Sequence, residues 1–285
     1  MVSSAQWREV VKWAYQLSER RAVRGIGASL STIRYRSDKA PHEPLRRRIR
    51  EVAEARTSWG YRQVHTILRR EGWKVNHRLV YRLYREEGLT LRRKRPKRRR
   101  MAVVRAEVPK TTRPNGRWAT EFGHDASASE RGLRVFAAVD VHTRECMALR
   151  VARKFTGEDV AGILSEIGAE RAALPEVISV DQGTEFTSKS LDHWAYWNRV
   201  RLNFSRPGKP TDNAFAEAFN SVLRRECLLQ HWFIDLEDAQ KVLDRWRADY
   251  NNFRPHGSLA RSTPADFAAG ALLTPGPQKL ENSRL

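Results

Sequence analysis

The sequence predicts an α/β protein in which a mixed α/β domain follows an all-helical region. Two observations carry this prediction. Apolar residues recur at helical spacing through the first 90 residues, whereas short apolar runs alternate with helical segments from residue 117 onward. The net charge also changes close to this boundary. Residues 1–110 contain 30 Lys and Arg against 10 Asp and Glu, while residues 111–285 contain 23 of each. A length of 285 residues also fits two domains better than one.

The composition excludes several classes of protein. No apolar run approaches the roughly 20 residues that a membrane helix needs, and Arg8, Glu9 and Lys12 stand where a secretory signal would need an apolar stretch. The two cysteines, Cys146 and Cys227, are too few for a disulfide framework or a Cys-rich zinc site. We therefore expect a cytoplasmic protein without a membrane partner.

The first helical segment is expected over residues 1–38. Trp7, Val10 and Ala14 belong to an apolar stripe at helical spacing. The glycines at 25 and 27 end this helix, and a short second helix follows.

Residues 41–90 are expected to form three further helices. One starts at Pro44, the next runs from Gly60 to Gly72, and the last is capped by Asn76 and ends at Gly88. Two short helices joined by a turn with glycine are typical of a helix-turn-helix motif.

The last of these helices carries three arginines near one face. Arg78, Arg82 and Arg85 are spaced by four and three residues, so they could contact DNA phosphates or guanine edges together. The pattern alone is equally compatible with an ordinary helical hairpin that has a charged solvent face.

A basic linker is expected over residues 91–113. Residues 91–100 contain eight cations, and such a run of like charge cannot pack into a core. Its natural counter-ion is a polyphosphate, which makes nucleic acid the favoured partner, although a solvated linker or RNA association would also fit. The expected DNA contacts in this linker are Arg92, Arg93, Lys94 and Arg95.

The second domain alternates strands and helices. Residues 133–141 and 176–180 are apolar runs typical of buried strands, and residues 157–174 carry an apolar helical stripe. No glycine-rich phosphate fingerprint of the Rossmann or P-loop kind occurs. The remaining expected elements are strands at 117–123, 145–151 and 201–205 and helices at 188–200, 213–228 and 236–251.

Two carboxylates occupy informative positions in this domain. Asp181 directly follows an apolar strand, and ligands of α/β sheets usually bind at such strand ends. Glu217 lies on the helix that starts near Asn213, outside its expected apolar stripe of Phe215, Ala218, Phe219, Val222 and Leu223. Either acid alone could equally be a strand-end cap or a solvated helix charge.

The sequence around these acids is distinctive. Residues 181–188 read DQGTEFTS, residues 204–220 read FSRPGKPTDNAFAEAFN, and residues 250–256 read YNNFRPH, before Thr263-Pro264. In these motifs the chain resembles the insertion-sequence transposases of the IS-three family, in their OrfB-like product. The 35 residues between Asp181 and Glu217 match the spacing of the Asp-Asp-35-Glu class. The resemblance implies an RNase H-like integrase core, over residues 114–270, followed by a tail at 271–285 that we expect to be disordered.

The resemblance also implies a catalytic triad of acids. The family pattern has Asp in its first strand, but the aligned residue here, in Trp118-Ala119-Thr120-Glu121-Phe122, is Glu121. Glu121, Asp181 and Glu217 are therefore the expected catalytic residues and ligands of Mg²⁺, with Mn²⁺ as an alternative. Oxygen ligands suit Mg²⁺, and two such ions can activate a nucleophile and stabilise a leaving alkoxide. The extra methylene of Glu121 shifts the carboxylate by about 1 Å, which can cost about a hundredfold in rate.

The implied function is DNA strand cleavage and strand transfer of an insertion sequence at the nucleoid. The implied partners are DNA, as element ends and target, other copies of the chain in a multimer on DNA, and the product of an upstream reading frame. Further expected DNA contacts, for which loop and helix-end charges are an equally good explanation, are Arg206, Lys209, Arg254 and His256.

Three alternatives stay open from the sequence. The chain could be a catalytically impaired DNA-binding remnant or regulator, because its first acid is Glu121. It could be an RNase H-type nuclease that acts on hybrids. A retroviral-type integrase is disfavoured, since those proteins carry a His-His-Cys-Cys zinc domain and both cysteines here lie in the second domain.

Overall fold

The computed structural model describes residues 16, 18–25, 27, 29, 31, 42–91, 111–126, 132–206 and 213–273. By their internal contacts, residues 1–48 and 49–285 form two compact units. The first contains the short helix α2 (Glu19–Gly25). The stripe expected at Trp7, Val10 and Ala14 lies outside the described residues. None of the helices in the described part of the chain has the length and apolar content to cross a bilayer.

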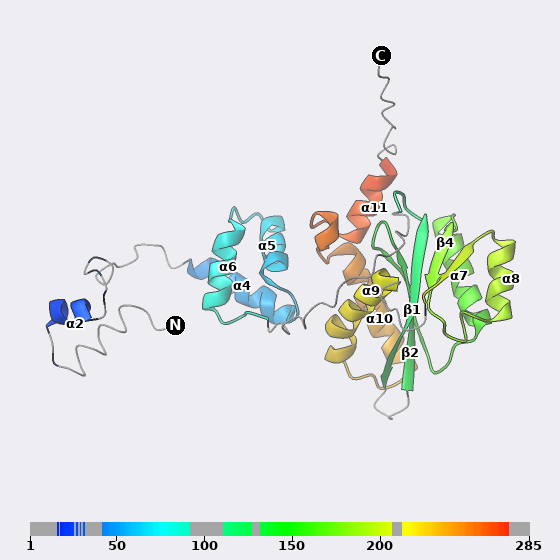
Figure 1. The fold of residues 1–285 in the computed structure, drawn as a ribbon, viewed down its shortest axis with the longest axis horizontal. Helices are drawn as coiled ribbons and strands as arrows, with labels where there is room; N and C mark the ends of the chain where they lie inside the picture. Colours follow the sequence, from blue (N-terminus) through cyan, green and yellow to red (C-terminus); the bar gives the residue numbers. More distant parts are fainter. Residues whose placement is uncertain are drawn as a thin grey trace, which may run out of the picture. The chain divides into compact units, whose positions relative to one another are not determined.

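Three helices lie between residue 42 and the expected basic linker, as the sequence predicts. They are α4 (Glu43–Ala55), α5 (Tyr61–Arg70) and α6 (His77–Glu86). The side chain of Asn76 caps α6 by accepting a hydrogen bond from the Arg78 amide at 2.8 Å. Gly72 and Gly88 follow α5 and α6 with φ of +88° and +72°, which is the left-handed region that ends many helices. Figure 1 shows α5 and α6 packed together as a helical hairpin.

Apolar side chains from α5 and α6 form a small core between them. The buried residues include Val64 and Leu68 of α5 and Val80 and Leu83 of α6. The Tyr84 hydroxyl donates to the Trp59 carbonyl at 3.0 Å, so this polar group is satisfied within the core.

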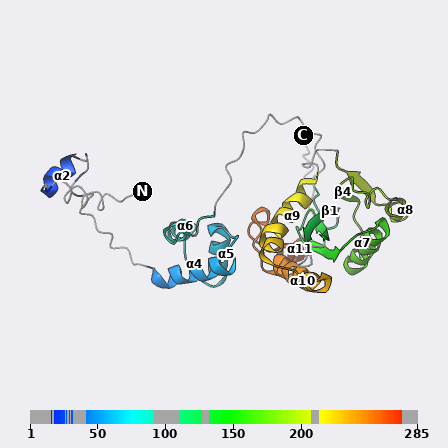
Figure 2. The ribbon, with the colours of Figure 1, turned by 90° about the horizontal axis from the view of Figure 1, so that it is seen from below.

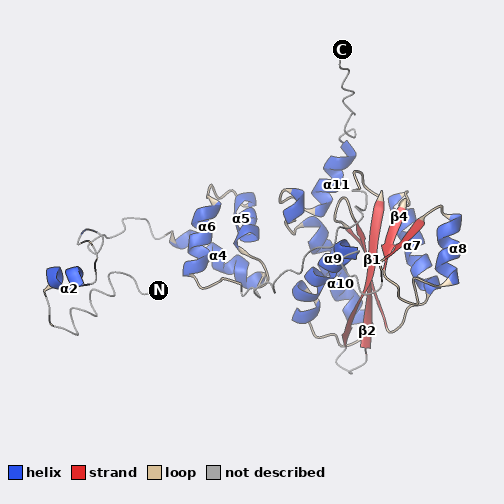
Figure 3. Cartoon of the chain, in the orientation of Figure 1, coloured by secondary structure: helices blue, strands red, loops and turns tan. Residues whose placement is uncertain are grey.

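A five-stranded mixed sheet forms the centre of the second domain (Figure 3). The strands lie in the order β3-β2-β1-β4-β5, with β1–β2 and β2–β3 antiparallel and β1–β4 and β4–β5 parallel. The strands are β1 (Arg117–Ala126), β2 (Gly132–Asp140), β3 (Cys146–Ala152), β4 (Val177–Val180) and β5 (Arg201–Phe204).

Helices cover both faces of this sheet (Figure 2). Helices α7 (Gly157–Arg171) and α8 (Lys189–Trp197) pack on one face, and α9 (Ala214–Glu226) and α10 (Leu236–Asn252) pack on the other. Strand β2 supplies both cores because its side chains alternate: Phe136 faces α7, whereas Val135 and Ala137 face α9 and α10. The fold class predicted from the sequence is confirmed.

The chain approaches itself closely where α7 begins. A Cβ added at Gly157 would lie 1.7 Å from the Ser188 hydroxyl, so only glycine fits between the start of α7 and the residue that caps α8. Thr156 and Asp159 form a reciprocal capping box around this start, with the Thr156 hydroxyl accepting from the Asp159 amide.

Two details differ from the sequence-based expectations. The chain forms an additional helix, α11 (Pro264–Leu273), which runs past the boundary expected at residue 270; residues 274–285 lie outside the described part of the structure. The buried face of α9 contains Ala216 in place of Phe215 and Ala218. Ala216 packs against Ala119 and Val141, where a larger side chain would hold the helix away from the sheet. Phe215 is 43% exposed and its ring lies 4.2 Å from the Arg144 guanidinium.

Candidate active site

Two of the three predicted acids lie on neighbouring strands. In the parallel pairing of β1 and β4, Ala119 is opposite Ser179. Continuing this register by two residues brings Glu121 level with Asp181, which directly follows the last residue of β4. Because adjacent strands are about 4.8 Å apart, the pairing brings these two carboxylates to one end of β4.

The third acid comes from the helix that packs on the same side of β1. Glu121 and Ala119 share a face of β1 because residues two apart in a strand point the same way. Ala216 of α9 packs on that face, against Ala119. The next residue of α9 is Glu217, and its charge acts on Glu121. The three predicted acids are therefore brought together from two strands and one helix.

Burial and neighbouring charges strongly perturb the pKa of Glu121. Burial raises its pKa from 4.5 to about 7, and the like charges of Glu217 and Asp181 act in the same direction. The neighbouring Asn220 side chain acts in the opposite direction and lowers the pKa of Glu121. Such a pKa is expected where carboxylates converge.

The oxygen atoms around Glu121 suit a hard divalent cation. Among the described residues, Glu121 Oε2, Asn213 Oδ1 and Asn220 Oδ1 are buried without a hydrogen-bond partner. Buried oxygens usually have a partner, so three on neighbouring elements fit a positively charged ligand. Within the same described part, no three acids, histidines or cysteines are close enough to form a ready-made metal cluster. The donor set fits Mg²⁺ or Mn²⁺, provided that the side chains move together around the ion.

The loop that carries Asp181 is held in place from two sides. The Gly183 amide donates to Asp181 Oδ1 at 2.7 Å. Two residues later, the buried Glu185 forms an ion pair with Arg134 of β2. The Arg134 guanidinium also lies 4.4 Å from the Phe122 ring of β1. These contacts tie the loop after β4 to the strands β1 and β2.

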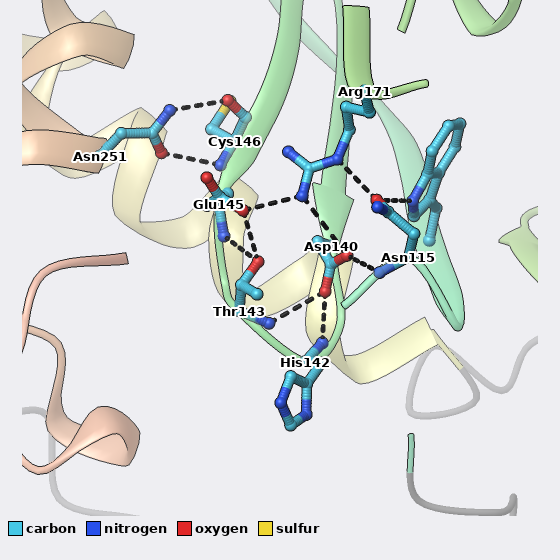
Figure 4. Close-up of polar contacts among 9 residues, drawn as sticks. Asn115, Asp140, His142, Thr143, Glu145, Cys146, Arg171 and Asn251 are labelled. Carbon is cyan, nitrogen blue, oxygen red and sulfur yellow. Dashed lines mark hydrogen bonds and ion pairs between the residues drawn. The ribbon is translucent and has the colours of Figure 1, made fainter. Parts of the chain in front are cut away.

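A polar network fixes the start of β1 (Figure 4). Asp140 is fully buried at the end of β2, and its Oδ1 accepts hydrogen bonds from the His142 and Thr143 amides at 2.7 and 2.9 Å. Its Oδ2 accepts from the Asn115 amide at 2.6 Å. Arg171 of α7 donates to Asn115 Oδ1 and to Glu145, which completes the network. Asp140 therefore holds the segment before β1, and with it the register that brings Glu121 to Asp181.

The predicted DNA contacts on α6 are available on its surface. Arg78 and Arg85 are exposed, and the Arg85 guanidinium lies 5.7 Å from the exposed Tyr81 ring. Arg82 is partly buried and lies 3.7 Å from Glu86 one turn later. The structure thus presents these arginines on an exposed side of the helix-turn-helix-like hairpin.

The other predicted DNA contacts differ from these in burial and charge. Arg254 is buried and paired in two places with Glu226, at 2.7 and 2.8 Å, so its donors are engaged inside the fold. Burial and neighbouring arginines lower the pKa of His256 to about 4, which leaves its imidazole neutral at pH 7. Arg206 is exposed at the end of the chain segment after β5. The contacts expected at Arg92, Arg93, Lys94, Arg95 and Lys209 lie outside the described residues.

Sequence reasoning missed two residues of this site, Asn213 and Asn220. Both lie in the motif of residues 204–220, and they are spaced four and three residues from Glu217. That spacing places all three on one side of a helix. The helical period would have been sufficient to identify them, but asparagine at a helix start is more often a simple cap.

Comparisons with known proteins agree with this architecture. A model of an HTH-like domain matches residues 41–97, and two models of an integrase core domain match residues 111–210 and 198–264. Over 83% of this chain and 80% of the other, the fold matches a chain of the simian T-cell lymphotropic virus intasome solved in complex with PP2A regulatory subunit B56 gamma. The TM-score is 0.53 and the sequence identity is 14%, so this likeness concerns the fold alone.

Sequence relatives come from bacterial insertion elements. The chain is 42% identical to the insertion element IS407 uncharacterized 31.7 kDa protein of Burkholderia multivorans, over 89% of this chain and 91% of that protein. It is 37% identical to the insertion element IS476 uncharacterized 39.2 kDa protein of Xanthomonas euvesicatoria, over 89% of this chain and 73% of that protein. It is 26% identical to the putative transposase InsK for insertion sequence element IS150 of Escherichia coli, over 78% and 82%. With its HTH-like domain and its integrase core, the chain belongs to the IS-three family of insertion-sequence transposases.

Proposed function

We propose that this chain catalyses metal-dependent cleavage and joining of DNA strands during transposition of an insertion element. The observation that carries the proposal is the convergence of Glu121, Asp181 and Glu217, since the charges of the latter two act on Glu121 at one end of β4. Its family and its integrase core supply the reaction class.

Glu121, Asp181 and Glu217 would hold Mg²⁺ or Mn²⁺. When bound, such ions lower the barrier by stabilising both the attacking and the leaving oxygen of a phosphodiester. The strands β1 and β4 would keep two of the carboxylates at a fixed spacing, and α9 would bring the third. The side chains of Asn213 and Asn220 add buried amide oxygens beside the same strand.

The proposed reaction has two displacements at phosphorus. In the first, water forms a new P–O bond at the element end, and the bond to the 3′ oxygen breaks to leave a 3′-OH. In the second, that 3′-OH forms a P–O bond to the target strand and displaces a 3′ oxygen of the target. Each step exchanges one P–O bond for another, so it needs no external energy source.

DNA is the proposed partner of both domains. The exposed arginines of α6 would hold the duplex, and the acids of the core would act on it. We also propose that several copies of the chain assemble on DNA, because both element ends must be brought to one target, and that this happens at the bacterial nucleoid.

The arrangement around Glu121 favours a working enzyme over an impaired remnant. A decayed site has no physical reason to retain three converging carboxylates, because like charges raise the free energy of the folded state.

The first prediction tests the assignment of the acids. Asp181→Asn and Glu217→Gln each remove one charge with little change in shape, so we expect cleavage and joining to fall by at least about a hundredfold. The measurement is release of nicked and joined strands from a plasmid that carries the element encoding this chain, with Mg²⁺ or Mn²⁺. The matched control is Asp192→Asn on the exposed surface of α8, which should act like the parent. Cleavage by Asp181→Asn at the parental rate would show that this site is not the catalytic centre.

A further inference from the structure

Arg117, the first residue of β1, is buried without an acidic partner. The residue is only 7% exposed, and arginine is seldom buried unless it is paired. Its Nε and Nη2 donate to the Ser179 hydroxyl at 2.8 and 2.5 Å. No carboxylate of the described residues forms an ion pair with it. Because a hydroxyl is a neutral acceptor, the positive charge of Arg117 stays uncompensated.

A second arginine lies level with Arg117 at the edge of the sheet. Arg117 is opposite Val177 in the β1–β4 pairing, and Val177 is opposite Arg201 in the β4–β5 pairing. Such partners point to one face of the sheet, and two strand spacings put the backbones of the two arginines about 10 Å apart. Burial, and then the charge of Arg201, lower the pKa of the Arg117 guanidinium. Two like charges at this spacing attract an anion between them.

The two arginines share a sheet face with the predicted acids. Arg117 and Glu121 are four residues apart in β1, so their side chains point the same way. On this face α9 and α10 pack over β1, β2 and β3, whereas α8 packs against β5 from the opposite face (Figure 1). Arg201 is exposed, and Asn203, the next residue of β5 on this face, is partly exposed. Solvent therefore reaches this face at β5.

The remaining donors suit a phosphate group. Arg117 Nη1 makes no hydrogen bond in the described structure, and it is absent from the fully buried atoms that lack a partner there, so solvent reaches this atom. The Ser179 hydroxyl holds the other two nitrogens and thereby fixes the plane of the guanidinium. A planar guanidinium held in this way is well suited to donate to phosphate oxygens.

The spacing along the strands fits DNA. Glu121 lies four residues along β1 from Arg117, which corresponds to about 13 Å. B-DNA rises about 3.4 Å per nucleotide along each strand. A strand that has one phosphate at the acids therefore has another near Arg117, about four nucleotides away.

We propose that Arg117 and Arg201 form a phosphate-binding site for a DNA strand, about four nucleotides from the bond that the acids would cleave. Ser179 orients the Arg117 guanidinium in this site. The bound phosphate supplies the negative charge that Arg117 lacks within the fold. The identity of the ligand as DNA rests on the proposed function.

Stability without a ligand tests whether the charge of Arg117 is uncompensated. The double variant Arg117→Met, Ser179→Ala removes both hydrogen-bonding partners and keeps a long side chain in β1. We expect it to unfold at the same urea concentration as the parent or at a higher one, because a buried charge without a partner is unfavourable. Urea unfolding without phosphate or DNA is the measurement. A variant that unfolds at lower urea would show that Arg117 serves to hold Ser179, and would overturn the proposal.

Inorganic phosphate is the first binding probe. Phosphate should raise the melting temperature of the parent more than chloride does at the same ionic strength. The double variant and Arg201→Ala, which replaces an exposed side chain, should each require about tenfold more phosphate for the same rise. Arg245→Ala, on the surface of α10, is the charge-matched control and should respond like the parent. Equal phosphate responses of the parent and both variants would overturn the site.

Duplex DNA from the ends of the element that encodes this chain is the second probe. Fluorescence anisotropy measures its affinity, so the result does not depend on cleavage. Arg201→Ala should lower the slope of log affinity against log salt by about 1, and Arg245→Ala should leave it unchanged.

The two probes separate failure of this proposal from failure of the proposed function. A weaker phosphate response with an unchanged salt slope would assign the site to free phosphate and overturn its assignment to DNA. A parent that cleaves no DNA, although Arg201→Ala lowers both the phosphate response and the salt slope, would contradict the proposed function and support the site.

Discussion

At the scale of single residues, Glu121 concentrates the electrostatic strain of the site. Its carboxylate is partly buried on β1 and feels two other acids, and its pKa is raised to about 7. Because an unfolded glutamate titrates near 4.5, the folded protein binds a proton between about pH 4.5 and 7 that the unfolded chain does not bind. The metal-free site is therefore most favourable when Glu121 is protonated.

This linkage gives a prediction for stability against pH. Below about pH 4.5, Glu121 is neutral in both the folded and the unfolded protein, and its contribution to the free energy of unfolding is fully present. This contribution is lost as the pH rises through about 7. The resulting decrease should be about 1 kcal/mol, because partial exposure screens the repulsion. Urea unfolding of the parent and of Glu121→Gln, without metal, at about pH 5 and about pH 8 measures it. The variant should lose less stability at the higher pH than the parent, and equal losses would contradict the assignment; Glu166→Gln, exposed on α7, is the control.

At the scale of elements, helix α10 closes the outer edge of the sheet. Gln240 exchanges hydrogen bonds with the backbone of Leu149 and Val151, and Asn251 does the same with both backbone groups of Cys146. Arg247 donates to the Met147 carbonyl at 2.7 Å. Polar side chains of α10 thus hydrogen-bond the backbone groups of β3 that a neighbouring strand would otherwise bind. This blocks pairing with another chain at this edge.

This edge contact has a measurable strength. Asn251→Ala leaves the Cys146 amide and carbonyl without partners in a buried place, so the free energy of unfolding should fall by about 1–3 kcal/mol. Chemical denaturation followed by tryptophan fluorescence is the measurement. Asn252→Ala, one residue further along α10, should change stability by less than about 0.5 kcal/mol. If the two variants are equally stable, the Asn251 bonds carry no net stabilisation.

The sequence predicted the elements better than the contacts between them. Hydrophobic periodicity located all five strands of the described sheet and helices α7 to α10, because burial on a sheet or helix face leaves a regular pattern. It missed α11, whose apolar residues resemble a tail before two prolines. It could not assign Arg254 to a phosphate or to an internal ion pair, because a charge in a motif can serve either, and only the position of Glu226 shows the ion pair. The helical period puts Asn213 and Asn220 on one side with Glu217, but the burial of their amide oxygens depends on how α9 packs on β1.

At the scale of the whole molecule, charge and chemistry are divided between the domains. The positive excess lies within residues 1–110, and the remaining chain has equal numbers of acidic and basic residues. A basic domain attracts a polyanion over its whole length, whereas three converging acids in a neutral core would repel DNA phosphates unless cations are bound. Affinity and catalysis are therefore expected to respond to salt and to metal separately.

Salt dependence tests this division. Replacing Arg78 and Arg85 of α6 by Ala should weaken DNA binding and reduce the slope of log affinity against log salt by about 1 per lost phosphate contact. Fluorescence anisotropy of labelled duplex DNA, titrated at salt concentrations between about 50 and 200 mM, would measure the slope where affinity falls steeply. Arg245→Ala, on the surface of α10, is the charge-matched control. A slope that is unchanged in the α6 variants would remove this helix from the DNA interface.

The parallel pairing of β1 with β4 has a consequence for protein synthesis. Glu121 reaches its neighbour Asp181 only after β2, β3 and α7 have been made, and Glu217 is added later still, on α9. Contacts between such distant positions form slowly, since a long loop must close before they stabilise anything. An unfinished chain on the ribosome therefore carries its basic domain without the complete set of three converging acids. The nascent protein can therefore hold DNA before it is able to break it.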